Sequence, residues 1–145
     1  MEFITVEQFK EQPKEVQEVF LDWYNFDKYD LFYLKWEGAE KKWGATEEIV
    51  SGATLNRHLK HLKRANSNII NTIPLFTEGQ LRKFIEDKTG YKNIDITISP
   101  LEKGYYIELS DEEYHIQKSY HLLGEDLFQA YWKVACMIAE EEVDG

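Results

Sequence analysis

The stretch IDITISPLEKGYYIELS (residues 94–110) decides the fold of this chain, because apolar residues recur in it at every second position. Three isoleucines alternate with polar residues in its first half, and a Tyr, an Ile and a Leu alternate in the same way in its second half. A period of two is typical of a strand with one buried face, and the turn from Pro100 to Gly104 joins the two runs as a β-hairpin. A third strand is expected after Asp111, so the sequence predicts a three-stranded antiparallel meander over residues 93–120.

A long amphipathic helix is predicted at residues 125–142. Its apolar residues recur at helical spacing and form one broad stripe: Leu127, Phe128, Tyr131, Val134, Ala135, Ile138 and Ala139. A stripe of this width indicates burial of the helix against the meander. We therefore expect Ile96, Ile107, Tyr131 and Val134 to be buried together.

A second helix is predicted at residues 78–88, directly after the segment that reads IPLF. Thr77 followed three residues later by Gln80 matches a capping box, and the apolar residues that flank this pair match a hydrophobic staple. Gly90 supplies a residue that adopts the left-handed conformation in which helices commonly end. Both ends of this helix are therefore marked in the sequence.

The N-terminal part is predicted to be mostly helical. Pro13 begins an amphipathic helix that ends near Tyr24, and from Asp30 a run with alternating apolar residues indicates a strand. Residues 37–52 give no signal beyond a loop, and residues 54–66 match a helix with three leucines on one side.

These elements predict a single α+β domain over residues 1–145. Its N-terminal part, residues 1–70, is expected to be helical and aromatic with one extra strand. Its C-terminal part, residues 73–143, is expected to contain the helix, the meander and the C-terminal helix. No repeat or linker marks a further boundary.

Charge and composition exclude several classes of protein. The formal net charge is −10, which argues against direct nucleic-acid binding, since such proteins need a surplus of Lys and Arg on the contact face. No apolar run approaches the roughly 20 residues of a membrane-spanning helix, and we expect no contact with a membrane. The single cysteine, Cys136, agrees with a reducing compartment, and a cytoplasmic location in a bacterial host cell is expected.

No catalytic or metal-binding pattern stands out. Cys136 falls on the apolar side of the C-terminal helix, where burial penalises a thiolate. His58 and His61 lie three residues apart, but no third metal ligand is near them in sequence. We therefore predict no catalytic residues, no metal and no cofactor.

Aromatic residues are concentrated between Trp23 and Trp43. The segment contains eight rings: Trp23, Tyr24, Phe26, Tyr29, Phe32, Tyr33, Trp36 and Trp43. One helix and one strand cannot bury every ring, and exposed aromatic surface is enriched at protein interfaces. Tyr24, Tyr29 and Trp43 lie near the ends of elements, where burial is least assured, and they are the candidate partner-binding residues.

A basic stretch, residues 54–66, contains four cations and no acidic residue: Arg57, Lys60, Lys63 and Arg64. One interpretation is a solvated helix face. The alternative is a site for an anion or nucleotide, in which Arg57, Lys60 and Arg64 bind phosphate.

Two stretches of the C-terminal half, IPLFTEGQLRKFIEDK (residues 73–88) and AYWKVAC (residues 130–136), resemble small uncharacterised proteins encoded by phages and prophages of Gram-positive bacteria. The resemblance carries no catalytic residues. It implies an accessory role in a virus, and accessory proteins of this size often bind a host component.

The sequence is compatible with three functions. The first is a non-enzymatic phage or prophage protein that binds and occupies a host protein, as an inhibitor of a bacterial defence system. The second is a small-ligand binding protein that sequesters a nucleotide signal. The third is an enzyme, which would need a site that the sequence does not reveal.

Overall fold

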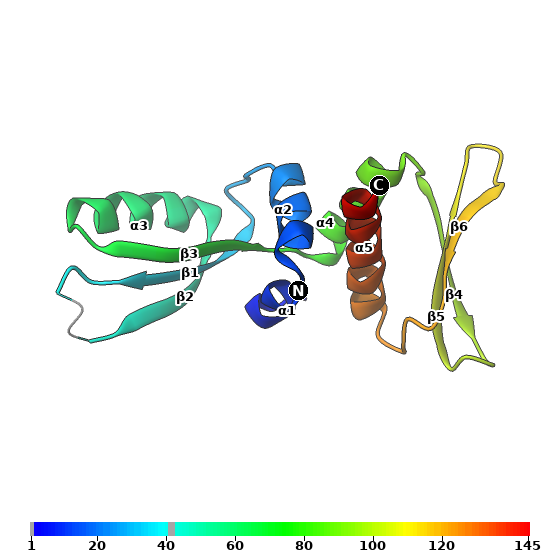
Figure 1. Cartoon of the computed structure of the whole chain (residues 1–145), viewed down its shortest axis with the longest axis horizontal. Coiled ribbons are helices and arrows are strands. Elements are labelled where there is room, and N and C mark those ends of the chain that lie inside the picture. The colour runs from blue at the N-terminus through cyan, green and yellow to red at the C-terminus, as the bar shows by residue number, and fades with distance from the viewer. Residues whose placement is uncertain (1, 41–42) are drawn as a thin grey trace. The chain divides into compact units, whose positions relative to one another are not determined.

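The computed structural model describes residues 2–40 and 43–145 (Figure 1). Its helices and strands, in chain order, are α1 (Val6–Glu11), α2 (Lys14–Trp23), β1 (Leu31–Glu37), β2 (Ala45–Ser51), α3 (Gly52–Arg64), β3 (Asn68–Leu75), α4 (Glu78–Thr89), β4 (Asn93–Ser99), β5 (Gly104–Ser110), β6 (Ile116–Tyr120) and α5 (Leu127–Asp144). The predicted α+β class is confirmed, with two antiparallel three-stranded sheets.

The chain divides into two compact units, which we name by their main elements. The meander unit comprises the described residues among 1–3, 10–23 and 77–145, and the α3 unit comprises those among 4–9 and 24–76. The boundary after residue 76 lies close to the predicted division between an N-terminal and a C-terminal part. Helix α2, however, belongs to the meander unit.

The meander unit contains the predicted antiparallel meander, with strand order β4-β5-β6. Ile96 pairs with Ile107, and Ile98 pairs with Tyr105, so the apolar residues of the hairpin share one face. Helix α5 contacts β5 on this face, and its other side packs against α2 and α4 (Figure 1). Because α5 is covered on both sides, its apolar stripe is broad.

Aromatic rings join the helices of the meander unit. The ring of Phe20 on α2 lies 4.4 Å from that of Phe84 on α4 and 5.2 Å from that of Trp132 on α5, and both pairs are stacked. Helix α2 is therefore fixed to the C-terminal helices by aromatic stacking, although more than fifty residues separate it from them in the sequence.

One part of the predicted core is wrong. Ile107, Tyr131 and Val134 are buried, but 36% of Ile96 is exposed. The reason is the position of β4 at the edge of the sheet: α5 covers the central strand β5, and the apolar face of β4 extends beyond it. The alternation of apolar and polar residues correctly predicted which face of β4 is apolar, but it could not show how much of that face the helix layer covers.

Both predicted ends of α4 are confirmed. The Oγ1 of Thr77 accepts from the backbone N–H of Gln80, and the side chain of Gln80 accepts from the backbone N–H of Thr77 at 2.9 Å. Gly90 follows the helix with φ 76°, in the left-handed region.

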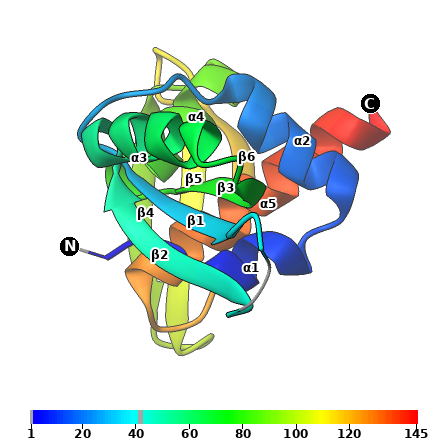
Figure 2. The ribbon, with the colours of Figure 1, turned by 90° about the vertical axis from the view of Figure 1, so that its left-hand side faces the viewer.

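The α3 unit is a three-stranded antiparallel sheet with strand order β2-β1-β3 and one covering helix. Because β1 is antiparallel to both neighbours, β2 and β3 run parallel to each other, and α3 is the crossover between them. Figures 1 and 2 show α3 along one face of this sheet. Phe32 and Leu34 of β1 pack there against Leu55 and Leu62 of α3.

The predicted number of strands in this part is wrong, since the structure has three and the sequence indicated one. Residues 45–51, predicted as loop, form β2, and residues 68–75 form β3. Neither strand alternates cleanly, because β2 has Ile49 and Val50 in adjacent positions and β3 has Ile69 and Ile70 in adjacent positions. These strands are stabilised by pairing with β1, which a local pattern does not reveal.

Candidate functional site

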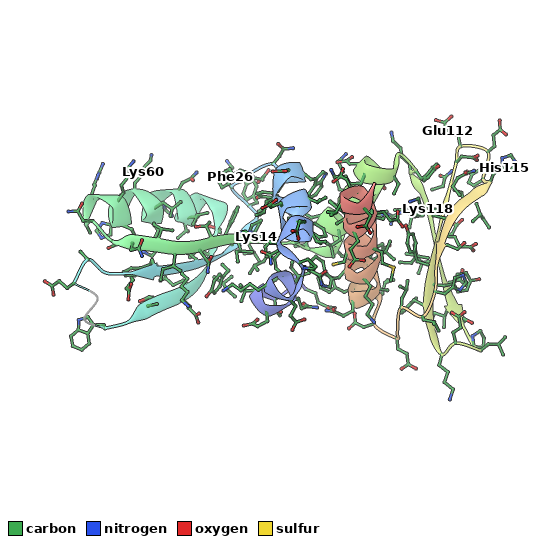
Figure 3. All side chains as sticks on the ribbon, in the orientation of Figure 1. Lys14, Phe26, Lys60, Glu112, His115 and Lys118 are labelled. Atoms are coloured by element: carbon green, nitrogen blue, oxygen red, sulfur yellow. The ribbon has the colours of Figure 1, made fainter. Side chains whose placement is uncertain are left out.

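Helix α3 presents the basic residues of the candidate ligand site. Ser51 caps its N-terminus, with the Oγ accepting a hydrogen bond from the backbone N–H of Thr54 at 3.3 Å. Leu55 and Leu62 are buried on the side that faces the sheet. The side chains on the opposite side therefore point to solvent, as Lys60 does in Figure 3.

Arg57, Lys60 and Arg64 form a row along this exposed side, and we call it the basic row. Their spacings of three and four residues place them on one line of an α-helix, over about 10 Å along its axis. All three are exposed, and among the described residues none forms an ion pair with them. The structure thus brings the three predicted ligand residues together.

The position of the basic row is only partly explained by helix stability. Cations in the last turn, such as Lys63 and Arg64, interact favourably with the helix dipole. Arg57 and Lys60 lie before that turn, where the dipole gives little stabilisation. A row of uncompensated cations can bind an anion whose phosphates or carboxylates lie along the helix.

A pocket of about 410 Å³ adjoins the end of α3. Its lining includes Trp36 near the end of β1, Glu40 and Trp43 on the β1–β2 connection, and Ala65 and Ser67 directly after the helix. The pocket thus places two indole rings beside the C-terminal end of the basic helix α3, within the α3 unit. A volume of this size is within the range that holds a small ligand.

The three candidate partner-binding residues have different surroundings. Tyr24 is half-buried: its hydroxyl donates to a carboxylate oxygen of Asp30, and its ring contacts Phe32 and Phe76. Burial, followed by the hydrogen bond to Asp30, raises the pKa of Tyr24, so the hydroxyl stays protonated and keeps donating. Tyr24 positions the connection that follows α2 and offers little free surface.

Tyr29 and Trp43 are almost fully exposed, at 80% and 89%. Tyr29 lies on the connection between α2 and β1, which is held to the start of α3 by two backbone hydrogen bonds: Gly52 N–H to Asp30 C=O at 2.9 Å and Ala53 N–H to Lys28 C=O at 3.0 Å. Trp43 lies on the connection between β1 and β2. The backbone bonds hold the Tyr29 connection in a defined conformation.

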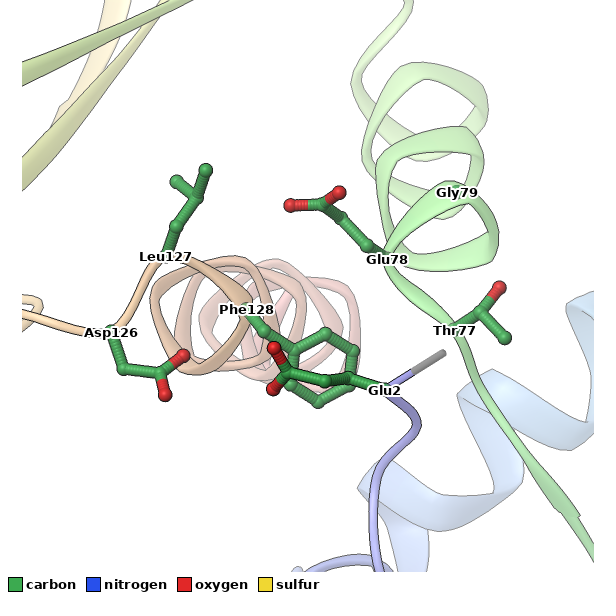
Figure 4. Close-up of a pocket in the computed structure, with 7 residues that line it drawn as sticks. All are labelled: Glu2, Thr77, Glu78, Gly79, Asp126, Leu127 and Phe128. Atoms are coloured by element: carbon green, nitrogen blue, oxygen red, sulfur yellow. The ribbon is translucent and has the colours of Figure 1, made fainter.

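A larger pocket, of about 680 Å³, lies in the meander unit where α4 and α5 begin (Figure 4). Glu2, Glu78 and Asp126 line it, and no lysine or arginine is among its described lining residues. The two helix N-termini are already capped by Thr77 and Asp126. Three carboxylates around capped helix ends repel an anion, so this pocket shows no anion site.

The side chains considered above as nucleophiles or metal ligands lie in surroundings that do not favour these roles. Cys136 is buried on α5, and burial raises the pKa of its thiol, so it is a poor nucleophile. His58 lies 3.3 Å from the carboxylate of Glu48, and His61 is exposed. Among the residues that the structure describes, no group of three His, Cys, Asp or Glu could hold a metal ion.

Sequence reasoning missed several exposed apolar side chains. Phe26, on the same connection as Tyr29, is half-exposed and stacks on Phe32. Ile98 on β4 is 63% exposed, although its alternation with polar residues predicted a core position. The edge position of β4, which a meander implies, was the signal that could have revealed Ile98, but the sequence does not show how far α5 covers the sheet.

Comparison with known proteins returned no match among protein-family models, curated proteins or solved structures. Within the described part of the chain, no helix combines the length and the apolar character needed to cross a membrane.

Proposed function

We propose that this protein is a non-enzymatic accessory protein of a phage or prophage, which acts in the cytoplasm of the host cell by binding a host protein and occupying it. The target that we expect is a component of a bacterial defence system. The phage origin in this proposal rests on the sequence resemblance of residues 73–88 and 130–136.

The exposure of Tyr29 and Trp43 is the observation that carries this proposal. Burial of a large aromatic side chain on folding is strongly favourable, and the neighbouring rings of Phe32 and Tyr33 are buried. Tyr and Trp are enriched among the residues that dominate binding energy at protein interfaces. Two rings that are 80% and 89% exposed, one of them on a connection held by backbone hydrogen bonds, are suited to binding a protein partner.

The surroundings of the reactive groups support the non-enzymatic part of the proposal. General acid–base or nucleophilic catalysis needs a titratable group that is shifted toward reactivity and open to a substrate. The groups with the clearest shifts here include Cys136, whose shift disfavours the thiolate, and Tyr24, whose hydroxyl is engaged with Asp30.

The function can be tested by affinity capture from a bacterial lysate with the full chain as bait, followed by reconstitution with the purified candidate. We expect one host protein to bind in a fixed stoichiometry and to be released unmodified. A captured protein that is cleaved or covalently modified by this chain would contradict a non-enzymatic role.

A second candidate function is supported by the basic row. Arg57, Lys60 and Arg64 are uncompensated, and the pocket lined by Trp36 and Trp43 lies at the end of the same helix. A nucleotide could place its phosphates along the row and stack its base on an indole ring. This chain would then sequester a nucleotide signal.

The two functions differ in their dependence on the basic row. If a nucleotide binds there, a panel of nucleoside phosphates and cyclic dinucleotides should raise the melting temperature, since a ligand at 100 times its Kd stabilises the folded state by about 2.7 kcal/mol. Arg57→Ala/Lys60→Ala/Arg64→Ala should abolish that rise, and salt should weaken it. If the chain occupies a protein instead, the same variant should keep partner binding within about tenfold, or about 1.4 kcal/mol.

The control for this experiment removes three cations from the meander unit. Lys14, Lys92 and Lys103 are exposed, and their replacement by Ala changes the net charge by the same amount. A nucleotide effect that is lost equally in both triple variants would show nonspecific attraction and would contradict a site on α3.

A further inference from the structure

The strand β4 has a free edge and an uncovered apolar face. It pairs with β5 alone among the described strands, so the backbone groups on its other side have no strand partner. Ile96 and Ile98 are 36% and 63% exposed, and they lie on the face that α5 covers further along the sheet. An exposed edge of this kind is a template for pairing with another strand.

The opposite face of the same edge is acidic. Asp95 pairs directly with Glu108 of β5, and like charges in directly opposed positions of an antiparallel pair are destabilising. Among the described residues, neither carboxylate has a Lys or Arg partner, and the hydroxyl of Ser119 donates to Glu108 only at 3.5 Å. A cation beside Asp95 would relieve this repulsion.

We propose that the β4 edge binds an extended segment of the host protein whose side chains alternate between basic and apolar. Added to β4, such a strand places its apolar side chains beside Ile96 and Ile98 and its basic side chains beside Asp95. The seven residues Asn93–Ser99 offer an edge of about 23 Å. This inference rests on the proposed function, because it names the recognition element of the partner.

Charge favours this occupant over a second copy of the chain. The segments of the meander unit contain 20 acidic and 9 basic residues, so two copies repel each other. If two β4 strands paired antiparallel about Ile96, Asp95 would lie beside Thr97 of the other copy, and the repulsion between Asp95 and Glu108 would remain. A basic strand removes the repulsion that a second copy leaves.

The test uses two capped synthetic hexapeptides of identical composition. One alternates lysine and isoleucine, and the other has three lysines followed by three isoleucines. Both carry the same charge, but only the first presents lysine on one face of a strand and isoleucine on the other. We expect the alternating peptide to bind the full chain at least tenfold more tightly, and hydrogen exchange of residues 93–99 to slow when it binds.

Substitutions at exposed positions of β4 test whether the peptide binds at this edge. Asp95→Lys and Ile98→Lys should each weaken the alternating peptide at least tenfold. Asp22→Lys gives the same charge change at an exposed position of α2, and Ile116→Lys makes the same substitution on β6, the other edge of the sheet. Each control has the same change of net charge as the edge variant that it matches. Both controls should bind the alternating peptide within about twofold of wild type.

The proposal would be overturned if the two peptides bound equally, or if Ile116→Lys weakened the alternating peptide and Ile98→Lys did not. It would also be overturned by concentration-dependent dimers in sedimentation that Ile98→Lys abolishes. The last would assign the edge to a second copy. A captured host protein that binds Asp95→Lys and Ile98→Lys as tightly as wild type would also overturn it, while leaving the proposed function intact. Absence of any host partner would overturn the function, and the peptide experiment would still decide whether the edge accepts a strand.

Discussion

Phe84→Ala should lower the free energy of unfolding by about 3 to 5 kcal/mol, the range found when a fully buried ring is truncated in a packed core. Phe84 has no exposed surface, and its ring stacks on Phe20 at 4.4 Å and meets the edge of Trp23 at 5.2 Å. Its loss removes both of these ring contacts between α2 and α4. Urea titration followed by far-ultraviolet circular dichroism measures the change.

Leu101→Ala is the matched control, because this side chain lies in the β4–β5 turn and is almost fully exposed. Its truncation should change the unfolding free energy by about 0.5 kcal/mol or less. A loss below about 1 kcal/mol for Phe84→Ala would contradict the packing of α4 described above.

Gly52→Ala should destabilise the α3 unit by about 1 to 3 kcal/mol, the usual cost of forcing extra volume into a packed site. A Cβ at this position would lie 2.5 Å from the carbonyl oxygen of Asp27 and 2.9 Å from the Cα of Lys28. Both are backbone atoms, so the connection that carries Tyr29 must move away from α3. Faster hydrogen exchange in residues 24–36 and 52–64 should report this movement.

Gly79→Ala tests the same substitution where space is open, since no atom lies within 4 Å of a Cβ built on Gly79. Alanine is favoured over glycine within a helix, so this variant should be neutral or more stable by up to about 1 kcal/mol. If Gly52→Ala behaved as Gly79→Ala does, the close approach at Gly52 would be wrong.

The parts of the fold that the sequence predicts are those whose stability is local. The capping box of Thr77 and Gln80 depends on only four consecutive residues, and α4 forms where expected. The hairpin of β4 and β5 follows from strict alternation around a turn. Strands β2 and β3 depend on pairing with β1, and the position of α2 depends on Phe20 meeting rings far along the chain, so neither could be predicted from a local pattern.

The candidate sites were predicted to different extents. The basic row is a property of one helix, so helical spacing was sufficient to place Arg57, Lys60 and Arg64 on one side. The surplus of aromatic residues correctly indicated exposed rings, but it could not separate Tyr24, which is half-buried, from Tyr29 and Trp43. The exposed face of β4 could not be predicted, because it depends on how far α5 extends over the edge of the sheet.

The dissociation constant of the purified complex between this chain and its host protein tests the central claim most directly. Tyr29→Ala/Trp43→Ala should weaken it at least about thirtyfold, or about 2 kcal/mol, which is the size of a hot-spot loss. Tyr114→Asn removes an exposed ring from the meander unit at a position with φ 64°, which Asn tolerates, and should leave the constant within about twofold. A folded double variant that binds as tightly as wild type would contradict the claim that these two rings contribute to the interface with the host protein.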